Sequence, residues 1–381
     1  MMVYFDNNAT TPLGQNALAS YSLALEQNWQ NPSSPYRSSA RARTLLERAR
    51  FDLANSFGIK KEEIIFTSGA TESNNAVFAH FGKTLNSTGQ CLLSPFEHSS
   101  VVESAKYWFQ DRVHFMPSDH SGIIDLDGVE KLLKQEDICL VSLMAANNES
   151  GILLPWQEMA RICSLQGIHF HCDATQWIGK LALNNFSLCS SFSASAHKFA
   201  GPKGVGWLVS KHPIQMQMGG GQEGSLRGGT ENLPGVISML TAWEEITLKL
   251  ALLGDRYLWR NQFERDLKNI VPNVGILGEE VPRLWNTSLF VVPKYENLSW
   301  VGKLDKIGYS VSTGSACSTN KSEYSLIASA MGLSGSESRR LIRVSSYFDQ
   351  TESDWSNLAQ AFGRTYEELC SESSRSSVIS I

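Results

Sequence analysis

The stretch EIIFTSGATE, residues 63–72, decides the fold class of this chain. Glu63–Phe66 predicts a short buried strand, the small residues Thr67–Thr71 predict a turn, and a helical pattern follows. The alternation of strand and helix continues through further predicted strands at Cys91–Ser94, Val113–Phe115, Ile138–Met144, Ile168–Cys172, Ser191–Ser195 and Val205–Val209. This order predicts an α/β fold whose large domain holds a mostly parallel sheet flanked by helices.

The pattern changes after residue 232, where shorter strands mix with helices. Asn232–Ile270 is mostly helical with an interruption near Gly254, and the mixed segments are Thr287–Val292, Tyr309–Ser312, Ser322–Met331, Leu341–Val344 and Glu352–Cys370. At roughly 150 residues per domain, a chain of 381 residues predicts two domains. We expect a large domain over residues 15–255, a small α+β domain from residues 1–14 and 256–370, and a disordered Ser-rich tail over residues 371–381.

The composition excludes several classes of protein. Lys and Arg total 33 and Asp and Glu total 38, so the net charge of −5 argues against binding to nucleic acid or to an anionic membrane. Apolar residues make up 42% and charged residues 19%, which excludes a disordered chain. No apolar run approaches the ~18 residues of a membrane span, and the N-terminus does not resemble a signal peptide. Irregularly spaced cysteines without a C-x-x-C pair indicate free thiols in a cytoplasmic protein and no metal site.

Two polar features follow predicted strands. In the turn Thr67–Glu72, small residues let the backbone approach a ligand, and the free N–H groups at the helix start favour a phosphate. Asp173 ends the strand at Ile168–Cys172, where ligand sites of parallel sheets lie, and its carboxylate can keep a heterocycle nitrogen protonated. Taken alone, the turn is better explained by ordinary helix capping, and for Asp173 capping explains the residue as well as a ligand site does.

A third feature is Lys198, which directly follows a strand of apolar and small residues. Partial desolvation there favours the neutral amine that forms a Schiff base, although most lysines are only solvated surface groups. Ser195 and His197 lie beside it and can donate hydrogen bonds to a phosphate. The Gly-rich run Gly219–Thr230 matches a dinucleotide fingerprint in its letters, but no convincing strand precedes it, so we reject a nicotinamide site.

Two residues of the C-terminal half add to these features. Cys317 lies in a segment of Gly, Ser, Thr and Asn, a composition typical of a loop with an exposed, reactive thiol. Arg343 follows Leu341 and Ile342 on a predicted strand, where its planar guanidinium can bind a substrate carboxylate. A buried structural cysteine and a surface arginine are the alternatives.

Together these residues identify a resemblance to the cysteine desulfurases, within the class V aminotransferase group of pyridoxal-phosphate enzymes. The resemblance runs from Tyr4 to about Arg343, and its motifs are YFDNNATTP (4–12), NPSS (31–34), FTSGATESNN (66–75), EHSSV (97–101), NNESG (147–151), HCDATQ (171–176), SAHKFAGPKG (195–204), GGGQEGSLRGGTEN (219–232) and GSACS (314–318). It implies a fold like that of the type I pyridoxal-phosphate transferases, with the cofactor in the large domain.

The resemblance also implies the residues of the reaction. Lys198 would form a Schiff base with pyridoxal 5'-phosphate, Asp173 would pair with the pyridine nitrogen, and His98 would stack on the ring and transfer protons. Arg343 would bind the carboxylate of L-cysteine. Cys317 would attack the substrate sulfur, leaving L-alanine and a persulfide that passes to an acceptor, such as an iron–sulfur scaffold protein or a thiolation carrier.

Further residues are implied to bind the cofactor. Gln176 and Asn148 would contact the ring-side oxygen or the substrate. The residues implied to hold the phosphate are Ala70, Thr71, Ser195 and His197. Thr230 would reach the phosphate of the partner subunit, which implies a homodimer with shared sites.

The sequence departs from the family pattern at three places that bear on docking and substrate fit. Tyr36 stands after NPSS where a His is common, Gly224 follows Glu223 where an Arg is usual, and Val344–Phe348 lacks the usual Gly. Rival interpretations are a selenocysteine lyase, a class V aminotransferase and a non-enzymatic binding partner. The GSACS loop argues against a plain aminotransferase, and the intact set of Lys198, Asp173, His98 and Cys317 argues against a scaffold.

Overall fold

The computed structural model describes residues 2–84, 88–183, 185–314 and 326–378. The centre of its larger part is a seven-stranded sheet in the order β2-β8-β7-β6-β5-β3-β4. Its strands are β2 (Ile64–Thr67), β3 (Gln90–Leu93), β4 (Val113–Phe115), β5 (Ile138–Ser142), β6 (His169–Asp173), β7 (Ser191–Ser195) and β8 (Gly206–Ser210). Within this sheet only β8 runs antiparallel to its neighbours, so the predicted mostly parallel sheet is confirmed.

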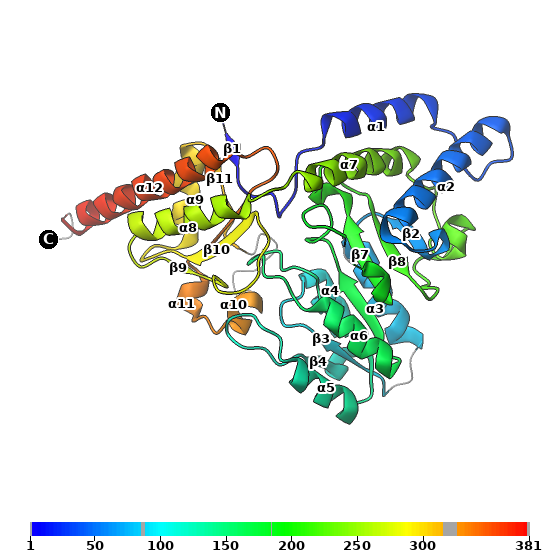
Figure 1. Cartoon of the computed structure of the whole chain (residues 1–381), viewed down its shortest axis with the longest axis horizontal. Helices are drawn as coiled ribbons and strands as arrows, with labels where there is room; N and C mark the ends of the chain where they lie inside the picture. Colours follow the sequence, from blue (N-terminus) through cyan, green and yellow to red (C-terminus); the bar gives the residue numbers. More distant parts are fainter. Residues whose placement is uncertain (1, 85–87, 184, 315–325, 379–381) are drawn as a thin grey trace.

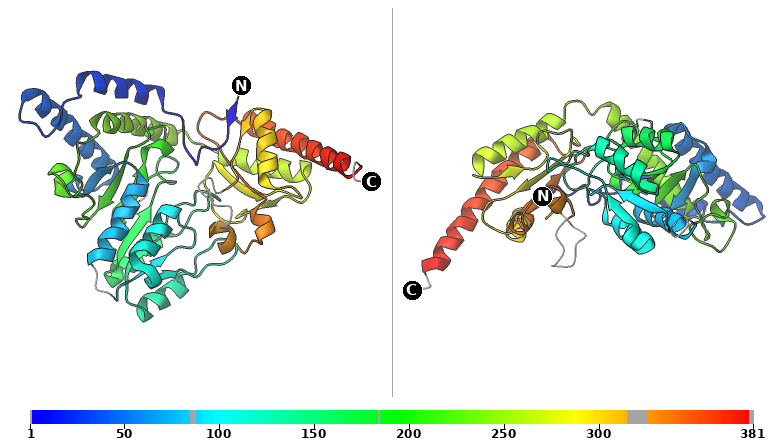
Figure 2. Two further views of the ribbon diagram at one scale, coloured as in Figure 1. Left: turned by 180° about the vertical axis from the view of Figure 1, so that it is seen from behind. Right: turned by 90° about the horizontal axis from the view of Figure 1, so that it is seen from below.

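Helices cover both faces of this sheet, as Figures 1 and 2 show. They are α1 (Gln15–Gln27), α2 (Arg37–Phe57), α3 (Ala70–Thr84), α4 (Ser99–Phe109), α5 (Leu126–Gln135), α6 (Trp156–Gln166) and α7 (Leu233–Ala251). Short 3-10 turns lie at Lys61–Glu63, Gln110–Arg112, Phe186–Leu188, Ala196–Lys198 and Gln222–Ser225. Successive strand residues point to opposite faces: Phe66 packs into the larger core, whereas Ile65 belongs to the core on the other face. Burial on both faces explains why the strands have apolar runs rather than an apolar–polar alternation.

The helix α2 shows how the sequence pattern produces this packing. Leu46, Leu53 and Phe57, at three- and four-residue steps, are buried in the larger core. The ring of Phe57 stacks on Trp243 of α7 with a centroid distance of 5.6 Å. The helix ends at Gly58, whose φ of 63° is a left-handed conformation that favours glycine.

The smaller part combines two small sheets with helices (Figure 1). One sheet has the order β12-β10-β9, and β1 pairs with β11 in the other. The elements are β1 (Val3–Tyr4), β9 (Gly275–Ile276), β10 (Thr287–Val291), β11 (Tyr309–Ser310), β12 (Leu341–Ser345), α8 (Tyr257–Ile270), α9 (Asn297–Lys306), α10 (Leu326–Ala330), α11 (Gly335–Ser338) and α12 (Glu352–Val378). A separate core there joins Phe5 to side chains of residues 263–369. This core supports a division near residue 255, with the N-terminal residues in the smaller domain, which we propose as the domain boundary.

The helix α12 extends past Ser371, where the composition predicts a disordered tail. It projects from the smaller part in Figures 1 and 2. Its first turns are anchored by the buried residues Trp355 and Phe362, and Lys303 donates to Glu368 and Glu372 at 2.8 Å each. A helix nucleated by packed residues continues at little cost through polar ones, which explains the difference. Across the described residues, the helices are all too short or too polar to cross a lipid bilayer.

Candidate active site

The carboxyl ends of three strands bring predicted site residues to one edge of the seven-stranded sheet. Strand β6 ends at Asp173, β7 ends at Ser195, and β2 ends at Thr67, just before α3 begins with Ala70. These strands run in the same direction, because β8 lies antiparallel between β2 and β7. Ligand sites of parallel sheets lie at this edge, as the sequence predicts.

A cavity of about 350 Å³ opens at this edge, with all four predicted phosphate contacts in its wall. It is lined by Ala9, Thr10, Ser68, Gly69, Ala70, Thr71, Glu72, Ser195, His197, Lys203 and Gly204. The Ala70 N–H donates to Ser195 Oγ at 2.8 Å, so the first turn of α3 is tied to the end of β7. Gly69 has a φ of 150°, and a Cβ there would lie 3.2 Å from Ser195 Oγ, so a larger residue would crowd the turn.

The charges around this cavity favour an anion. Lys203 is part of the lining, and the N-terminus of the 15-residue helix α3 faces the cavity. Burial and the nearby charges of Lys198 and Lys203 lower the pKa of His197 to about 3, so this ring stays neutral. Its Nδ1 lies 3.1 Å from Thr10 Oγ1. Glu72 also lines the cavity, but its carboxylate is paired with Arg227 at 2.9 Å, so the Lys203 ammonium and neutral donors remain to meet a bound anion.

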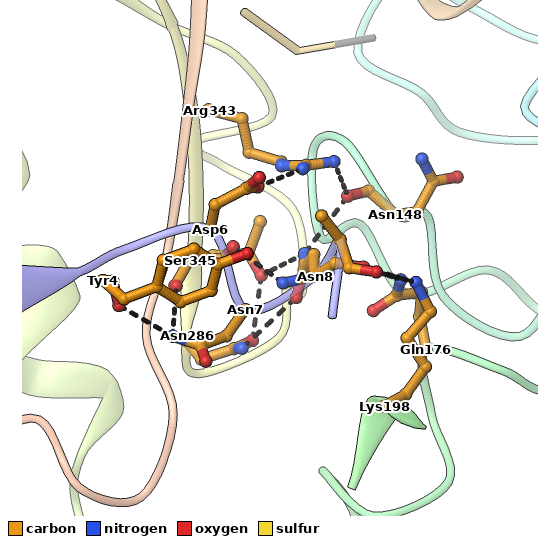
Figure 3. Close-up of polar contacts among 12 residues, drawn as sticks. Tyr4, Asp6, Asn7, Asn8, Asn148, Gln176, Lys198, Asn286, Arg343 and Ser345 are labelled. Atoms are coloured by element: carbon orange, nitrogen blue, oxygen red, sulfur yellow. Dashed lines mark hydrogen bonds and ion pairs between the residues drawn. The ribbon is translucent and has the colours of Figure 1, made fainter. Parts of the chain in front are cut away.

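Lys198 lies beside this cavity and is held by the N-terminal segment. Its Nζ donates to the carbonyl oxygens of Asn8 at 2.7 Å and Ala9 at 2.8 Å. Gln176 Nε2 donates to the same Asn8 carbonyl at 3.0 Å, so one peptide oxygen joins two predicted site residues (Figure 3). The Gln176 Oε1 in turn accepts from the fully buried Lys180, whose pKa burial lowers well below its ordinary value.

Arg343 lies on β12 at the opposite side of Asn8. Its Nη1 donates to the Asn148 carbonyl at 3.0 Å, and its Nη2 pairs with the carboxylate of Asp6 (Figure 3). Asn8 Nδ2 also donates to the Asn148 carbonyl, at 3.1 Å. Asn148 thus takes part through its backbone, and the guanidinium of Arg343 has a carboxylate partner already.

The Asn8 side chain ties the two parts of the molecule together. Its Nδ2 also donates to Thr287 Oγ1 at 2.9 Å, its Oδ1 accepts from Asn286 Nδ2 at 3.3 Å, and the backbone N–H of Asn8 donates to Ser345 Oγ at 2.9 Å. We call this set the seam, and it comprises Asp6, Asn8, Asn148, Asn286, Thr287, Arg343 and Ser345. Its members come from segments far apart in the sequence.

Asp173 and His98 are joined by hydrogen bonds through residues between them. Asp173 is buried, with Oδ1 accepting from the Thr175 N–H at 3.0 Å and Oδ2 accepting from Asn74 Nδ2 at 2.9 Å. His98 caps the N-terminus of α4, where its Nδ1 accepts from the Ser100 N–H at 3.1 Å. Burial lowers the pKa of His98, Asp173 opposes the shift, and Lys198 adds to it. For Asp173, local capping explains only the bond from the Thr175 N–H to Oδ1, and it does not explain the bond from Asn74 to Oδ2.

Two predicted residues remain apart from this arrangement. Thr230 is exposed and is not among the residues that line the cavity. The loop that precedes it is anchored by Glu223, which accepts from Arg50 Nη1 at 2.8 Å and from the Phe66 N–H at 2.9 Å. Cys317 lies outside the described residues, so its role stays a prediction.

The sequence-based prediction missed several residues that hold this site. Asn8, Asn74 and Ser100 carry hydrogen bonds to predicted residues, and Lys203 lines the cavity. A signal was present in the paired asparagines at positions 7–8, 74–75 and 147–148, which lie inside the quoted motifs. Because asparagine has both donors and an acceptor, buried asparagines mark places where polar groups are joined.

The fold and the site define a class of enzyme with a lysine, a buried carboxylate and an anion cavity at the carboxyl edge of its sheet. The sequence model of the family Aminotransferase class-V matches residues 3–358, so the chain belongs to the class-V aminotransferase family. Within this family it is similar to "Cysteine desulfurase IscS" of Dictyoglomus turgidum, at 36% identity over 96% of this chain and 95% of the relative. The predicted resemblance is thus confirmed.

The fold is also similar to those of solved structures. The fold is similar to that of a "NifS-like protein", with a TM-score of 0.88 and 31% identity over 96% of this chain and all of the other. It is also similar to "SspA in complex with cysteine", with a TM-score of 0.77 and 27% identity over 90% of this chain and 98% of the other.

Proposed function

We propose that this protein is a pyridoxal-phosphate-dependent cysteine desulfurase that converts L-cysteine to L-alanine and passes the sulfur to an acceptor. One observation carries the proposal: Lys198, Asp173 and the anion cavity meet at one edge of the sheet. The similarity to proteins named cysteine desulfurase supports the same activity.

The donors around the cavity fit a pyridoxal phosphate. The phosphate matches the N-terminus of α3 together with Ser195, His197 and Lys203, and the small residues leave room for it. The buried carboxylate of Asp173 suits a protonated ring nitrogen, and Lys198 supplies the amine that carries the cofactor. Once bound, this cofactor supplies an electron sink that makes the Cα proton of the substrate acidic.

The protein's own residues would bind the substrate and move its protons. Arg343 binds the substrate carboxylate, with Asp6 holding the guanidinium in place until the substrate arrives. Lys198 accepts a proton at Nζ, while the carbonyls of Asn8 and Ala9 fix its position. His98 serves as the second proton-transfer group beside Asp173, and burial keeps its ring neutral.

Sulfur transfer needs a nucleophile, which we assign to Cys317. The Cys317 thiolate attacks the sulfur of the substrate, the substrate's Cβ–S bond breaks, and the electron pair stays with the carbon fragment. That fragment takes up a proton and leaves as alanine, and the enzyme keeps a persulfide. Atoms and electrons balance without a further oxidant, because cysteine plus enzyme thiol becomes alanine plus enzyme persulfide.

The finer features belong to the same proposal. The exposed position of Thr230, away from its own cavity, supports a contact with the phosphate of a partner subunit in a homodimer. The chemistry of a persulfide suits an iron–sulfur scaffold protein or a thiolation carrier in the cytoplasm as the acceptor. Light scattering that gives a single chain mass for a fully active enzyme would contradict the shared site.

Mass spectrometry after cysteine treatment tests the proposal. The wild-type chain should gain one sulfur on Cys317, and Cys317→Ala should keep the cofactor absorbance but lose sulfide release. Cys370→Ala is the matched control, because Cys370 is a partly exposed free cysteine on α12. Sulfide release at the wild-type rate by Cys317→Ala would favour the lyase alternative, because an aminotransferase leaves the carbon–sulfur bond intact. Selenocysteine should be assayed in parallel, because its better leaving group can depart without thiol attack.

A further inference from the structure

A fully buried amide on α3 connects the two groups expected to face the cofactor ring. Asn74 has no exposed surface, and its Nδ2 donates to Asp173 Oδ2 and to Ser100 Oγ, both at 2.9 Å. Both amide protons are therefore engaged. One bond leads to the carboxylate of Asp173 and the other leads toward His98.

The oxygen side of this amide is engaged as well. Asn74 Oδ1 accepts from Ser193 Oγ at 2.6 Å and lies 3.0 Å from His171 Nε2. Reversing the amide would set its oxygen against the Asp173 carboxylate, which can only accept hydrogen bonds when ionised. The contacts of Asn74 thus allow one orientation.

A second buried chain of contacts supports this orientation. With its Nε2 proton directed at Asn74, His171 must accept at Nδ1, where Ser191 Oγ lies 2.9 Å away. Burial lowers the pKa of His171 to about 4, so the ring is neutral and can accept there. Ser191 Oγ is in turn 2.8 Å from His169 Nε2. From His169 through Ser191 and His171 to Asn74, each hydrogen-bond donor therefore meets an acceptor.

The same logic reaches His98 through Ser100. His98 Nδ1 must accept, because the Ser100 backbone N–H donates to it, so the Ser100 hydroxyl, which accepts from Asn74, directs its own proton at the same nitrogen, 2.9 Å away. The Ser100 N–H donates to the same nitrogen at 3.1 Å. A ring nitrogen that accepts two hydrogen bonds carries no proton, so the proton of neutral His98 lies on Nε2.

We propose that Asn74 is a positioning residue that, through the single orientation of its amide, fixes both the carboxylate of Asp173 and the tautomer of His98. This inference rests on the proposed function, because Asp173 and His98 matter for catalysis only if they face the cofactor. The charged or titratable groups around His98 are Asp173 on β6, Lys198 after β7 and Glu97 beside it on its own segment.

Selective ¹⁵N-histidine NMR of the full-length holoenzyme tests this proposal. His98, assigned by a His98→Gln variant, should show a protonated Nε2 and an unprotonated Nδ1 in the wild type. Asn74→Ala frees the Ser100 hydroxyl to turn away, and Ser100→Ala removes it. Both should raise the pH midpoint of His98 by about one unit and increase the share of the Nδ1-protonated tautomer, because one of the two donors to Nδ1 is lost and only the backbone N–H of residue 100 remains.

Two neighbours provide matched controls. Asn75 and Ser99 are adjacent in sequence but exposed, so Asn75→Ala and Ser99→Ala should leave the His98 signals unchanged. Unchanged tautomer and midpoint in Asn74→Ala would overturn the proposal. If Asn74→Ala does not fold, unchanged signals in Ser100→Ala overturn it, and shifted signals support it.

The outcome separates this inference from the proposed function. Shifted His98 signals in a protein that never releases sulfide from cysteine would support the positioning role and refute the desulfurase. Normal desulfurase activity in the wild type, with unchanged His98 signals in the variants, would support the desulfurase and refute the positioning role.

Discussion

The carboxyl edge of the seven-stranded sheet and the seam hold their functional side chains in different ways. At the sheet edge, Asp173, Ser195 and Ala70 take their positions from the ends of β6 and β7 and from the start of α3. In the seam, Arg343 and Asn8 are held by bonds between residues 140 to 337 positions apart. The edge is built by secondary structure, and the seam is built by tertiary contacts.

The difference indicates which part of the reaction each region serves. Groups proposed to hold the cofactor lie at the edge, where strand ends give a fixed geometry. Groups proposed to hold the substrate lie in the seam, where the smaller part meets the larger one. Damage to the edge should therefore abolish the chemistry, whereas damage to the seam should weaken substrate binding and stability.

Lys198→Ala should cause the largest loss. Without the amine that carries the cofactor, cysteine turnover should fall by about 1,000-fold or more, as expected when a covalent-catalysis residue is removed. The thermal midpoint should change little, and borohydride reduction should label Lys198 in the wild type. The exposed Lys211 provides the control, since Lys211→Ala should retain full activity. A label on Lys180 or Lys203 would contradict the assignment.

Arg343→Lys tests the substrate side of the comparison. A lysine keeps the charge but loses the planar two-donor geometry, so KM for cysteine should rise roughly 10-fold to 100-fold while cofactor absorbance stays normal. Arg339→Lys, at an exposed arginine paired with Glu296, should leave KM unchanged. If Arg343→Lys weakens cofactor binding as strongly as it raises KM, the sheet edge and the seam do not act separately.

Asn8→Ala should weaken the seam itself. Three side-chain hydrogen bonds of a residue that is 1% exposed are lost, to Asn148, Thr287 and Asn286. Loss of these bonds should lower the free energy of unfolding by about 2–3 kcal/mol, measured by urea denaturation. Asn16→Ala removes an exposed hydrogen bond to Glu245 and should cost far less. A stability equal to that of the control would mean that the seam is not a structural tie.

Glu97→Gln should give the smallest effect, seen in the pH dependence of stability. Burial, with the charge of Asp173, raises the pKa of Glu97 to about 8 from an ordinary 4.5. Between these values the folded state keeps a proton that the unfolded chain releases, so stability falls as the pH rises. The variant should remove a slope of up to about 1.4 kcal/mol per pH unit.

Comparing the wild type with Glu97→Gln between pH 7 and pH 8 isolates this group, because the buried Lys180, whose pKa is also lowered, contributes equally to both proteins. The buried rings of His169, His171 and His197 have lowered pKa values, so they add stability as the pH rises toward 6.5 and little above it. Identical slopes in the wild type and in Glu97→Gln between pH 7 and pH 8 would show that Glu97 is ionised in the folded protein.

The strands show how much of the fold the sequence predicts. Val113–Phe115 and Ser191–Ser195 were predicted with the observed bounds, and the other strands of the large sheet differ by one or two residues at their ends. Apolar runs bounded by turn residues are local signals, so they survive without tertiary information. The length of α12 was not predicted, because its C-terminal turns depend on Lys303 from another helix.

By itself, the sequence determined which polar groups lie at the sheet edge, because Asp173, Ser195, His197 and Lys198 lie within a few residues of strand ends whose direction follows from the alternating pattern. Only the tertiary structure decided how these groups are held. Asn8 meets Lys198 and Arg343 meets Asp6 across gaps of 190 and 337 residues, and Asn74 meets Asp173 across 99. Hydrogen bonds act over about 3 Å, so no spacing along the chain can reveal them until the core has brought the segments together.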